Sequence, residues 1–286
     1  MNEESTSIQS TARSAQDILL FDPISPAWAR DLKSAVYATP AAESAFAQAL
    51  GALKKQVASG EDQEKEFRRA VGLLILGRAE EALAVMEGVE AELPYQGFFV
   101  GQAHSQLGAW ERAQETLEKA LEVTPRDHDV RVAYLELITS RHDTERIAHE
   151  LEMGSHIEGT PDWFYFQGLL AERRRDFQHA LDQWERCVDL DPSHQKALFH
   201  LARELDRFGE EERALELYEE AARLRPIHAE TLMNLGLLYD DLEEYAKAER
   251  CFRAVCAKDP GNWRARMFLR DTQAALEMYY DEDQEK

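Results

Sequence analysis

The stretch ALELYEEAARLRP at residues 214–226 decides the fold of this chain. It predicts an amphipathic helix that ends at a proline, because proline has no backbone N–H and disfavours helix in the residue before it. The same pattern occurs 34 residues earlier as ALDQWERCVDLDP at 180–192, and 34 residues later as AERCFRAVCAKDP at 248–260. Each copy begins with Ala, has an aromatic residue four places on and has Pro twelve places after the Ala. The chain therefore repeats a helical unit at a fixed period.

Three consecutive units, 161–194, 195–228 and 229–262, share this pattern. A small residue recurs in the first predicted helix of each unit, where two helices would approach closely: Gly168, Ala202 and Gly236. An aromatic residue recurs in the second predicted helix, where it would fill the space between hairpins: Trp184, Tyr218 and Phe252.

This helix–turn–helix pattern, W-x₂-L-G-x₂-Y…A-x₃-F…P, resembles the tetratricopeptide repeat family. Neither short helix of such a unit can bury its apolar stripe alone, so successive hairpins stack on one another. The resemblance implies an all-α fold, a right-handed α-solenoid of helix–turn–helix hairpins.

The pattern weakens towards both ends of the chain. Ser25-Pro26 and Thr39-Pro40 each place a helix-capping residue before proline, which predicts helices at 26–37 and 40–58. The predicted organisation is a disordered segment at 1–20, N-terminal helices at 21–60, repeats at 63–262 with a degenerate unit at 128–160, a capping helix at 263–280 and an acidic tail at 281–286.

Composition narrows the class of protein. The formal net charge of the 286 residues is −22, with 55 acidic and 33 basic side chains. Because nucleic-acid affinity rests on Lys and Arg neutralising phosphates, this balance argues against direct binding of DNA, RNA or an anionic membrane. Three cysteines without a CxxC pair fit a reducing compartment. The N-terminus has no apolar signal region and no apolar run is long enough to span a membrane, so we expect a cytoplasmic protein.

The sequence carries no recognisable chemistry. It has no GxxxxGK[ST], GxSxG or HExxH motif, and we expect no catalytic residue, no metal and no cofactor. His149 and His156 read as solvated surface residues. Cys187 occupies a small-residue position of a second helix, which predicts a core residue. An enzyme is therefore not expected.

In the tetratricopeptide family, the first helices line a concave groove, and the second, fifth, ninth and twelfth positions of each unit face it. These positions predict an apolar stripe flanked by acids on one edge, with Lys196, Arg203 and Arg264 as isolated cations. Such a groove suits an extended protein segment or an amphipathic helix that carries basic residues. The residues predicted to bind a partner are Tyr165, Leu169, Lys196, Phe199, Arg203, Met233, Leu237, Arg264 and Met267.

Other interpretations stay open. The stripe is also explained by packing, or by the chain's own segment QDILLFDPI at 16–24 folding into the groove. A structural scaffold that self-associates end to end is the alternative to an adaptor. The Lys, Asn and Arg clamp with which some tetratricopeptide co-chaperones grip acidic chaperone tails is absent from these positions.

A second resemblance covers residues 21–286. The segments FDPISPAWARDLKSAVY at 21–37, NLGLLYDDLEEYAKAERCFRAV at 234–255 and RARMFLRDTQAALEMYYDEDQEK at 264–286 look like bacterial proteins in which such repeats precede a module similar to the C-terminal domain of the RNA polymerase alpha subunit. That DNA-binding module would follow Lys286, so no DNA-contacting residue carries over. The resemblance implies a transcription-associated function, with transcription machinery among the partners.

Overall fold

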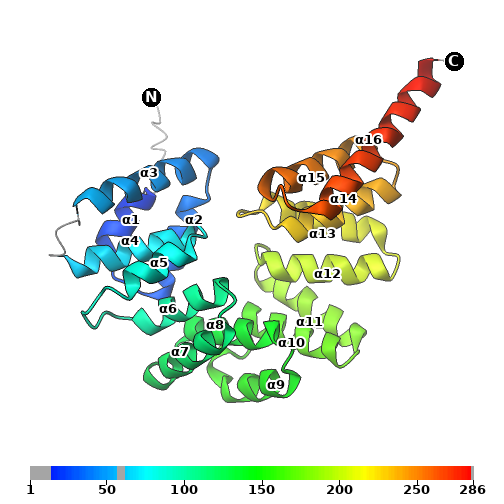
Figure 1. Cartoon of the computed structure of the whole chain (residues 1–286). Helices are drawn as coiled ribbons and strands as arrows, with labels where there is room; N and C mark the ends of the chain where they lie inside the picture. The colour runs from blue at the N-terminus through cyan, green and yellow to red at the C-terminus, as the bar shows by residue number, and fades with distance from the viewer. Residues whose placement is uncertain (1–13, 57–61, 285–286) are drawn as a thin grey trace, which may run out of the picture. The chain divides into compact units, whose positions relative to one another are not determined.

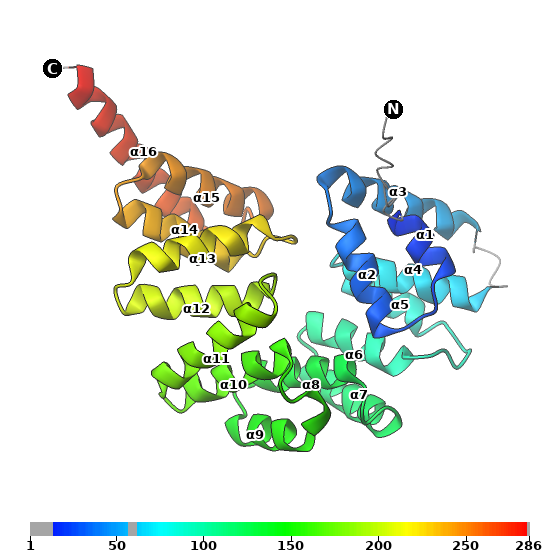
Figure 2. The same ribbon diagram turned by 180° about the vertical axis from the view of Figure 1, so that it is seen from behind.

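The computed structural model describes residues 14–56 and 62–284. Within these ranges the secondary structure consists of sixteen α-helices and one short 3₁₀ turn, which confirms the predicted all-α architecture. The chain divides into two units, one ending at His142 and the other beginning at Asp143. They are called unit 1 and unit 2, and each is described by itself (Figures 1 and 2).

Unit 1 contains eight helices. They are α1 (Ala15–Phe21), α2 (Pro26–Val36), α3 (Pro40–Gln56), α4 (Gln63–Ile75), α5 (Ala79–Met86), α6 (Gln96–Gln106), α7 (Trp110–Val123) and α8 (His128–Ser140). The hairpins α4–α5 and α6–α7 follow the repeat pattern, and α8 packs on α7.

Unit 2 contains the best-matched repeats, between a shorter helix at its start and a long helix at its end. Its elements are α9 (Thr144–Met153), the 3₁₀ turn Ser155–Ile157, α10 (Pro161–Arg173), α11 (Phe177–Leu190), α12 (Gln195–Arg207), α13 (Glu211–Arg223), α14 (Ala229–Asp241), α15 (Tyr245–Lys258) and α16 (Trp263–Gln284). Each of α10, α12 and α14 packs against the helix that follows it, and α16 packs on α15.

The two helices of each hairpin are joined by the same turn. In the α12–α13 hairpin, the Gly209 N–H donates to the Asp206 carbonyl (3.0 Å) and the Glu210 N–H donates to the Leu205 carbonyl (2.9 Å). Gly209 has a φ of +79°, the left-handed conformation that closes many helix C-termini. The residues with positive φ at the equivalent place in the other hairpins are Gly77, Gly108, Arg175 and Glu243.

The small residues of the first helices allow the close approach that the sequence predicts. A Cβ added to Gly168 would lie 2.3 Å from Trp184 Nε1, and one added to Gly236 would lie 2.7 Å from Phe252 Cε1. Trp184 and Phe252 are fully buried. In these two hairpins the aromatic residue, predicted to fill the space between hairpins, thus contacts the glycine of its own hairpin. Trp184 also packs against His200 of the next hairpin.

The ends of the helices depart from some predictions. Residues 15–20, predicted as disordered, belong to helix α1, and residues 1–13 lie outside the described residues. Helices α2 and α3 follow the predicted 26–37 and 40–58, although residues 57–61 lie outside the described part. Helix α16 continues to Gln284, past the predicted start of the acidic tail.

The segment QDILLFDPI packs into the core of unit 1. Ile18 and Leu19 are buried, and Trp28 Nε1 donates to the Ile18 carbonyl at 2.8 Å. Arg68 on α4 donates to the carbonyls of Leu19 (3.0 Å) and Asp22 (2.7 Å). The alternative in which this segment fills the groove predicted over residues 161–271 is therefore wrong. No described helix is long and apolar enough to cross a membrane.

Candidate functional site

The predicted groove positions of unit 2 lie on its first helices α10, α12, α14 and α16, and their exposure changes along this series. On α10, Tyr165 and Leu169 are only 7% and 5% exposed. On α12 and α14, Phe199, Met233 and Leu237 are half-buried. On α16, Met267 is 36% exposed. The apolar row is therefore closed at α10 and open from α12 onwards. Of the predicted cations, Lys196 and Arg203 are half-buried and Arg264 is exposed.

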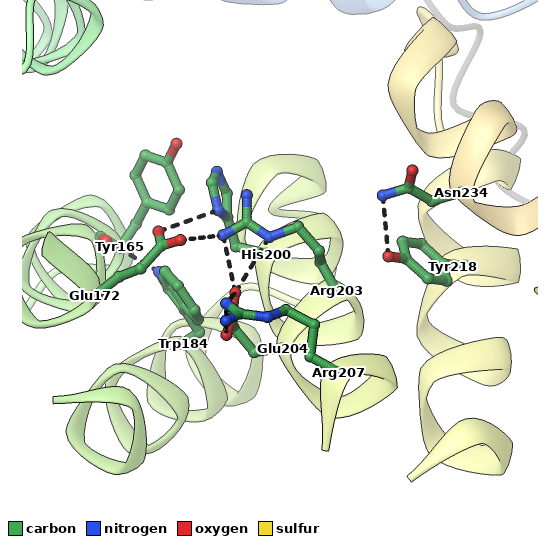
Figure 3. A network of polar contacts seen from close by, with 9 residues as sticks. All are labelled: Tyr165, Glu172, Trp184, His200, Arg203, Glu204, Arg207, Tyr218 and Asn234. Carbon is green, nitrogen blue, oxygen red and sulfur yellow. Dashed lines mark hydrogen bonds and ion pairs between the residues drawn. The ribbon is translucent and has the colours of Figure 1, made fainter. Parts of the chain in front are cut away.

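Aromatic rings close the α10 end. The Tyr165 ring lies 5.0 Å from the His194 ring and 5.8 Å from the His200 ring, measured between centroids. His200 also packs against Trp184 (5.1 Å) (Figure 3). The Phe199 ring lies 5.4 Å from His200. Tyr165 is therefore part of a packed aromatic cluster, whereas it was predicted to face a partner.

Arg203 is not an isolated cation, and that prediction is wrong. Its guanidinium forms an ion pair with Glu172 on α10 and donates to Glu204 Oε1 through Nε (3.2 Å) and Nη2 (3.1 Å) (Figure 3). Arg207 donates to the other Glu204 oxygen at 2.7 Å. Glu204 is 0% exposed, and a buried carboxylate is tolerated only when it is paired in this way. The two arginines are thereby fixed on the surface of α12.

Glu204 and His200 were missed at the sequence level, although Glu204 left a signal. It stands at the repeat position where the neighbouring units have Leu170 and Leu238. A charged residue at an otherwise apolar repeat position indicates a buried ion pair. Burial and the nearby Arg203 lower the pKa of His200 to about 3. The Glu172 carboxylate lies 3.9 Å from His200 Nδ1 and by itself would raise the pKa of His200. Its charge is already neutralised by Arg203.

Asp206 on α12 occupies the repeat position that Glu172 holds on α10, but no described cation pairs with it. Asp206 is half-buried, and its pKa is raised by burial and by the carboxylates of Asp241 and Glu211. It forms no ion pair with any described residue. At the next junction, by contrast, Asp240 accepts a hydrogen bond from Thr272 Oγ1 at 2.9 Å. The acidic edge of unit 2 is therefore uncompensated at Asp206.

The chain offers little for metal or nucleophilic chemistry within the described residues. These residues contain no group of three or more His, Cys, Asp or Glu side chains placed to hold a metal ion. His149 and His156 are both exposed. Cys187 is buried, as predicted, and burial raises the pKa of its thiol to about 12, so it stays protonated at neutral pH.

Comparison with protein families identifies the repeats. Family models described as tetratricopeptide repeat match residues 98–127, 165–229 and 229–262. The matched families include neither an enzyme family nor a polymerase alpha module. No protein of curated function matches the sequence.

Solved structures share the fold. The chain is similar to one in the crystal structure of the APC/C hetero-tetramer Cut9–Hcn1, with a TM-score of 0.65 and 12% identity over 86% of this chain and 48% of that one. It therefore spans about half of that relative. It is also similar to a tetratricopeptide repeat protein from Parabacteroides merdae, with a TM-score of 0.60 and 12% identity over 79% of this chain and 90% of that one. At this identity, the likeness establishes the stacked-hairpin fold alone.

Proposed function

Because residues 98–127 and 165–262 match the tetratricopeptide repeat, we propose that this chain is a non-catalytic adaptor that holds a segment of a partner protein on unit 2. Proteins built from this repeat generally mediate protein–protein interactions. The proposed contact area, called the docking surface, runs from α12 to α16 and consists of Phe199, Met233, Leu237 and Met267. The predicted Tyr165 and Leu169 would support it from below, and Lys196, Arg203 and Arg264 would line its edges.

The observation that carries this proposal is the open apolar row. Phe199, Met233 and Met267 recur at intervals of 34 residues on three successive first helices, and none of them is fully buried. Apolar side chains in a row that remains open to solvent are typical of protein-binding surfaces. Methionine suits such a surface, because its flexible side chain adapts to different partners.

Affinity capture from a lysate of the native organism tests the proposal. The wild type is compared with the triple variant Phe199→Ala/Met233→Ala/Met267→Ala, and captured proteins are identified by mass spectrometry. The matched control is Phe208→Ala/Leu242→Ala, which removes exposed apolar side chains from the hairpin turns. We expect a partner that is lost only with the docking-surface variant. Equal capture by all three folded proteins would overturn the proposal.

A transcription-associated function rests on the sequence resemblance alone. Polymerase subunits among the proteins captured by wild type, and absent with the docking-surface variant, would support it. Their absence from a capture that yields another partner would remove it and leave the adaptor proposal intact.

One observation favours the scaffold alternative. On α16, Trp263 and Met278 are 65% and 66% exposed, and they could contact a second copy of the chain. Light scattering over a range of concentrations tests this. A mass that rises with concentration and returns to the monomer value in Trp263→Ser/Met278→Ser would favour self-association, and a monomer throughout would dismiss it.

A further inference from the structure

In unit 1, the chain's own helix α2 packs across the first helices α4, α6 and α8, which are the counterparts of the helices that carry the docking surface in unit 2. The Arg68 guanidinium of α4 lies 5.5 Å from the centre of the Trp28 ring on α2. The ring of Phe99, on α6, lies 6.2 Å from the Trp28 ring. Arg30 of α2 forms an ion pair with Asp129 of α8. Helix α2 thus contacts three successive first helices, and Figures 1 and 2 both show it beside α4.

The residues with positive φ in the hairpin turns give a common reference for comparing repeat positions in the two units. Phe67 and Phe98 lie ten residues before Gly77 and Gly108, as Phe199 lies ten residues before Gly209. Phe67 and Phe98 are buried, whereas Phe199 is only half-buried. The same repeat position is therefore covered in unit 1 and partly open in unit 2.

Helix α2 has the pattern of an amphipathic ligand. Its buried residues Trp28, Leu32 and Val36 are spaced by four and form one stripe, while Arg30 and Lys33 lie on its exposed flanks. Asp129, which pairs with Arg30, stands thirteen residues before the left-handed His142, as Glu230 stands thirteen before Glu243. Asp129 pairs with a cation of α2 in unit 1, and the equivalent position in unit 2 is also acidic.

We propose that the docking surface of unit 2 binds an amphipathic helix of the same kind as α2, with an aromatic anchor in an i, i+4, i+8 apolar stripe and Arg or Lys on its flank. This inference rests on the proposed function and specifies its partner. A helix laid into a repeat face buries its stripe against the apolar row and brings its cations to the acidic edge.

Charge complementarity favours a basic helix. Asp206 is half-buried without a cation, beside Asp241 and Glu211. A cation from the partner would take the place that Arg203 holds at Glu172 one repeat earlier. Since the whole chain carries a net charge of −22, long-range attraction would also speed the approach of a basic helix.

The probe is a fluorescein-labelled synthetic peptide of residues 24–38, ISPAWARDLKSAVYA. Its binding to the full chain is followed by fluorescence anisotropy. We expect saturable binding that Met233→Ala weakens at least about tenfold and Phe208→Ala leaves unchanged. A peptide with Arg30→Glu and Lys33→Glu should bind at least about tenfold more weakly to the wild type. The Asp206→Lys variant should reverse this preference between the two peptides.

Three results would overturn the inference. They are absence of binding, equal binding of the charge-reversed peptide, and binding that no unit 2 variant alters. The third result would mean that the peptide binds outside the docking surface. A peptide with Ala29→Pro separates helix from extended segment, because proline breaks a helix interior; equal binding of that peptide would assign an extended ligand. A partner captured through the docking surface while the helical peptide fails to bind would leave the proposed function standing and remove this inference alone.

Discussion

Gly168 shows how a single residue sets the distance between the helices of a hairpin. Its missing Cβ would overlap Trp184 Nε1, which itself donates to the Tyr165 carbonyl at 3.2 Å. The indole cannot retreat, because Trp184 is fully buried. The helices α10 and α11 therefore depend on glycine at this place.

We expect Gly168→Ala to lower the free energy of unfolding by roughly 1–3 kcal/mol through overpacking. Gly51 is the matched control, since it lies in helix α3 with no atom within 4 Å of its added Cβ. Gly51→Ala should raise the free energy of unfolding by up to about 1 kcal/mol, because alanine is the better helix former. Urea unfolding of the two variants measures the difference, and effects of the same sign would contradict the close contact at Gly168.

His200 predicts a pH dependence of stability. Its pKa in the folded chain is about 3, below its ordinary value of 6.5, because burial and then Arg203 disfavour the charged imidazolium. Between these values the unfolded chain binds the extra proton, so stability is present above pH 6.5 and is lost as the pH falls towards 3.

Replacing His200 with Gln should remove up to about 1.4 kcal/mol per pH unit of this dependence, which corresponds to one proton. Urea unfolding of wild type and His200→Gln at several pH values between 3.5 and 7 measures it. Parallel curves for the two proteins would show that His200 titrates normally in the folded state.

At the scale of the element, the hairpin turn is the feature that recurs most regularly. The left-handed place is held by glycine at Gly77, Gly108 and Gly209, but by Arg175 with a φ of +63° between α10 and α11. A side chain in this conformation costs on the order of 1 kcal/mol. The same two turn hydrogen bonds form in both cases.

We expect Arg175→Gly to raise the free energy of unfolding by about 0.5–1 kcal/mol, and Gly209→Ala to lower it by about 1 kcal/mol. Thermal melting followed by circular dichroism provides the measurement. The Arg175→Ala variant is the control, because it removes the guanidinium and keeps a Cβ in the left-handed conformation. A gain of stability in Arg175→Ala equal to that in Arg175→Gly would assign the effect to charge and not to the backbone.

Helix α16 differs from the preceding first helices at the position of the recurring small residue. Arg270 stands at the repeat position of Gly168 and Gly236, where the other hairpins bring their second helix close. It is exposed and paired with Asp271, and Arg266 one turn earlier is exposed as well. This face of α16 is therefore charged where the preceding first helices are tightly packed.

At the scale of the molecule, helices contact mainly their neighbours in sequence. Stability in such a chain is a sum of hairpins and the interfaces between adjacent hairpins, and damage stays local. The chain accordingly divides into two compact units.

Trp184→Ala should cost roughly 3–5 kcal/mol, as truncation of a large buried side chain does. Hydrogen exchange followed by mass spectrometry on the full chain should show faster exchange in α10, α11 and α12 and unchanged exchange in α4 and α6. An increase spread evenly over both units would contradict local stability.

The hairpins, their turns and the small residues where paired helices approach were determined by the sequence itself. Each of these features is local, so it repeats with the period and leaves a visible pattern. The same pattern placed the apolar row on the first helices, although it could not show that Tyr165 is closed over and Met267 is open. Exposure depends on what covers a residue, and periodicity carries no information about that.

Other features were decided only by the tertiary structure. Helix α1 is held by Arg68, which donates to carbonyls 49 and 46 residues away in the sequence. Arg203 is tied to Glu172 across 31 residues, and Arg30 reaches Asp129 on α8. These contacts join residues that have no shared repeat position, and each forms only once the helices that carry them have packed. They decide which residues of the repeat are covered by other parts of the chain and which stay open to solvent.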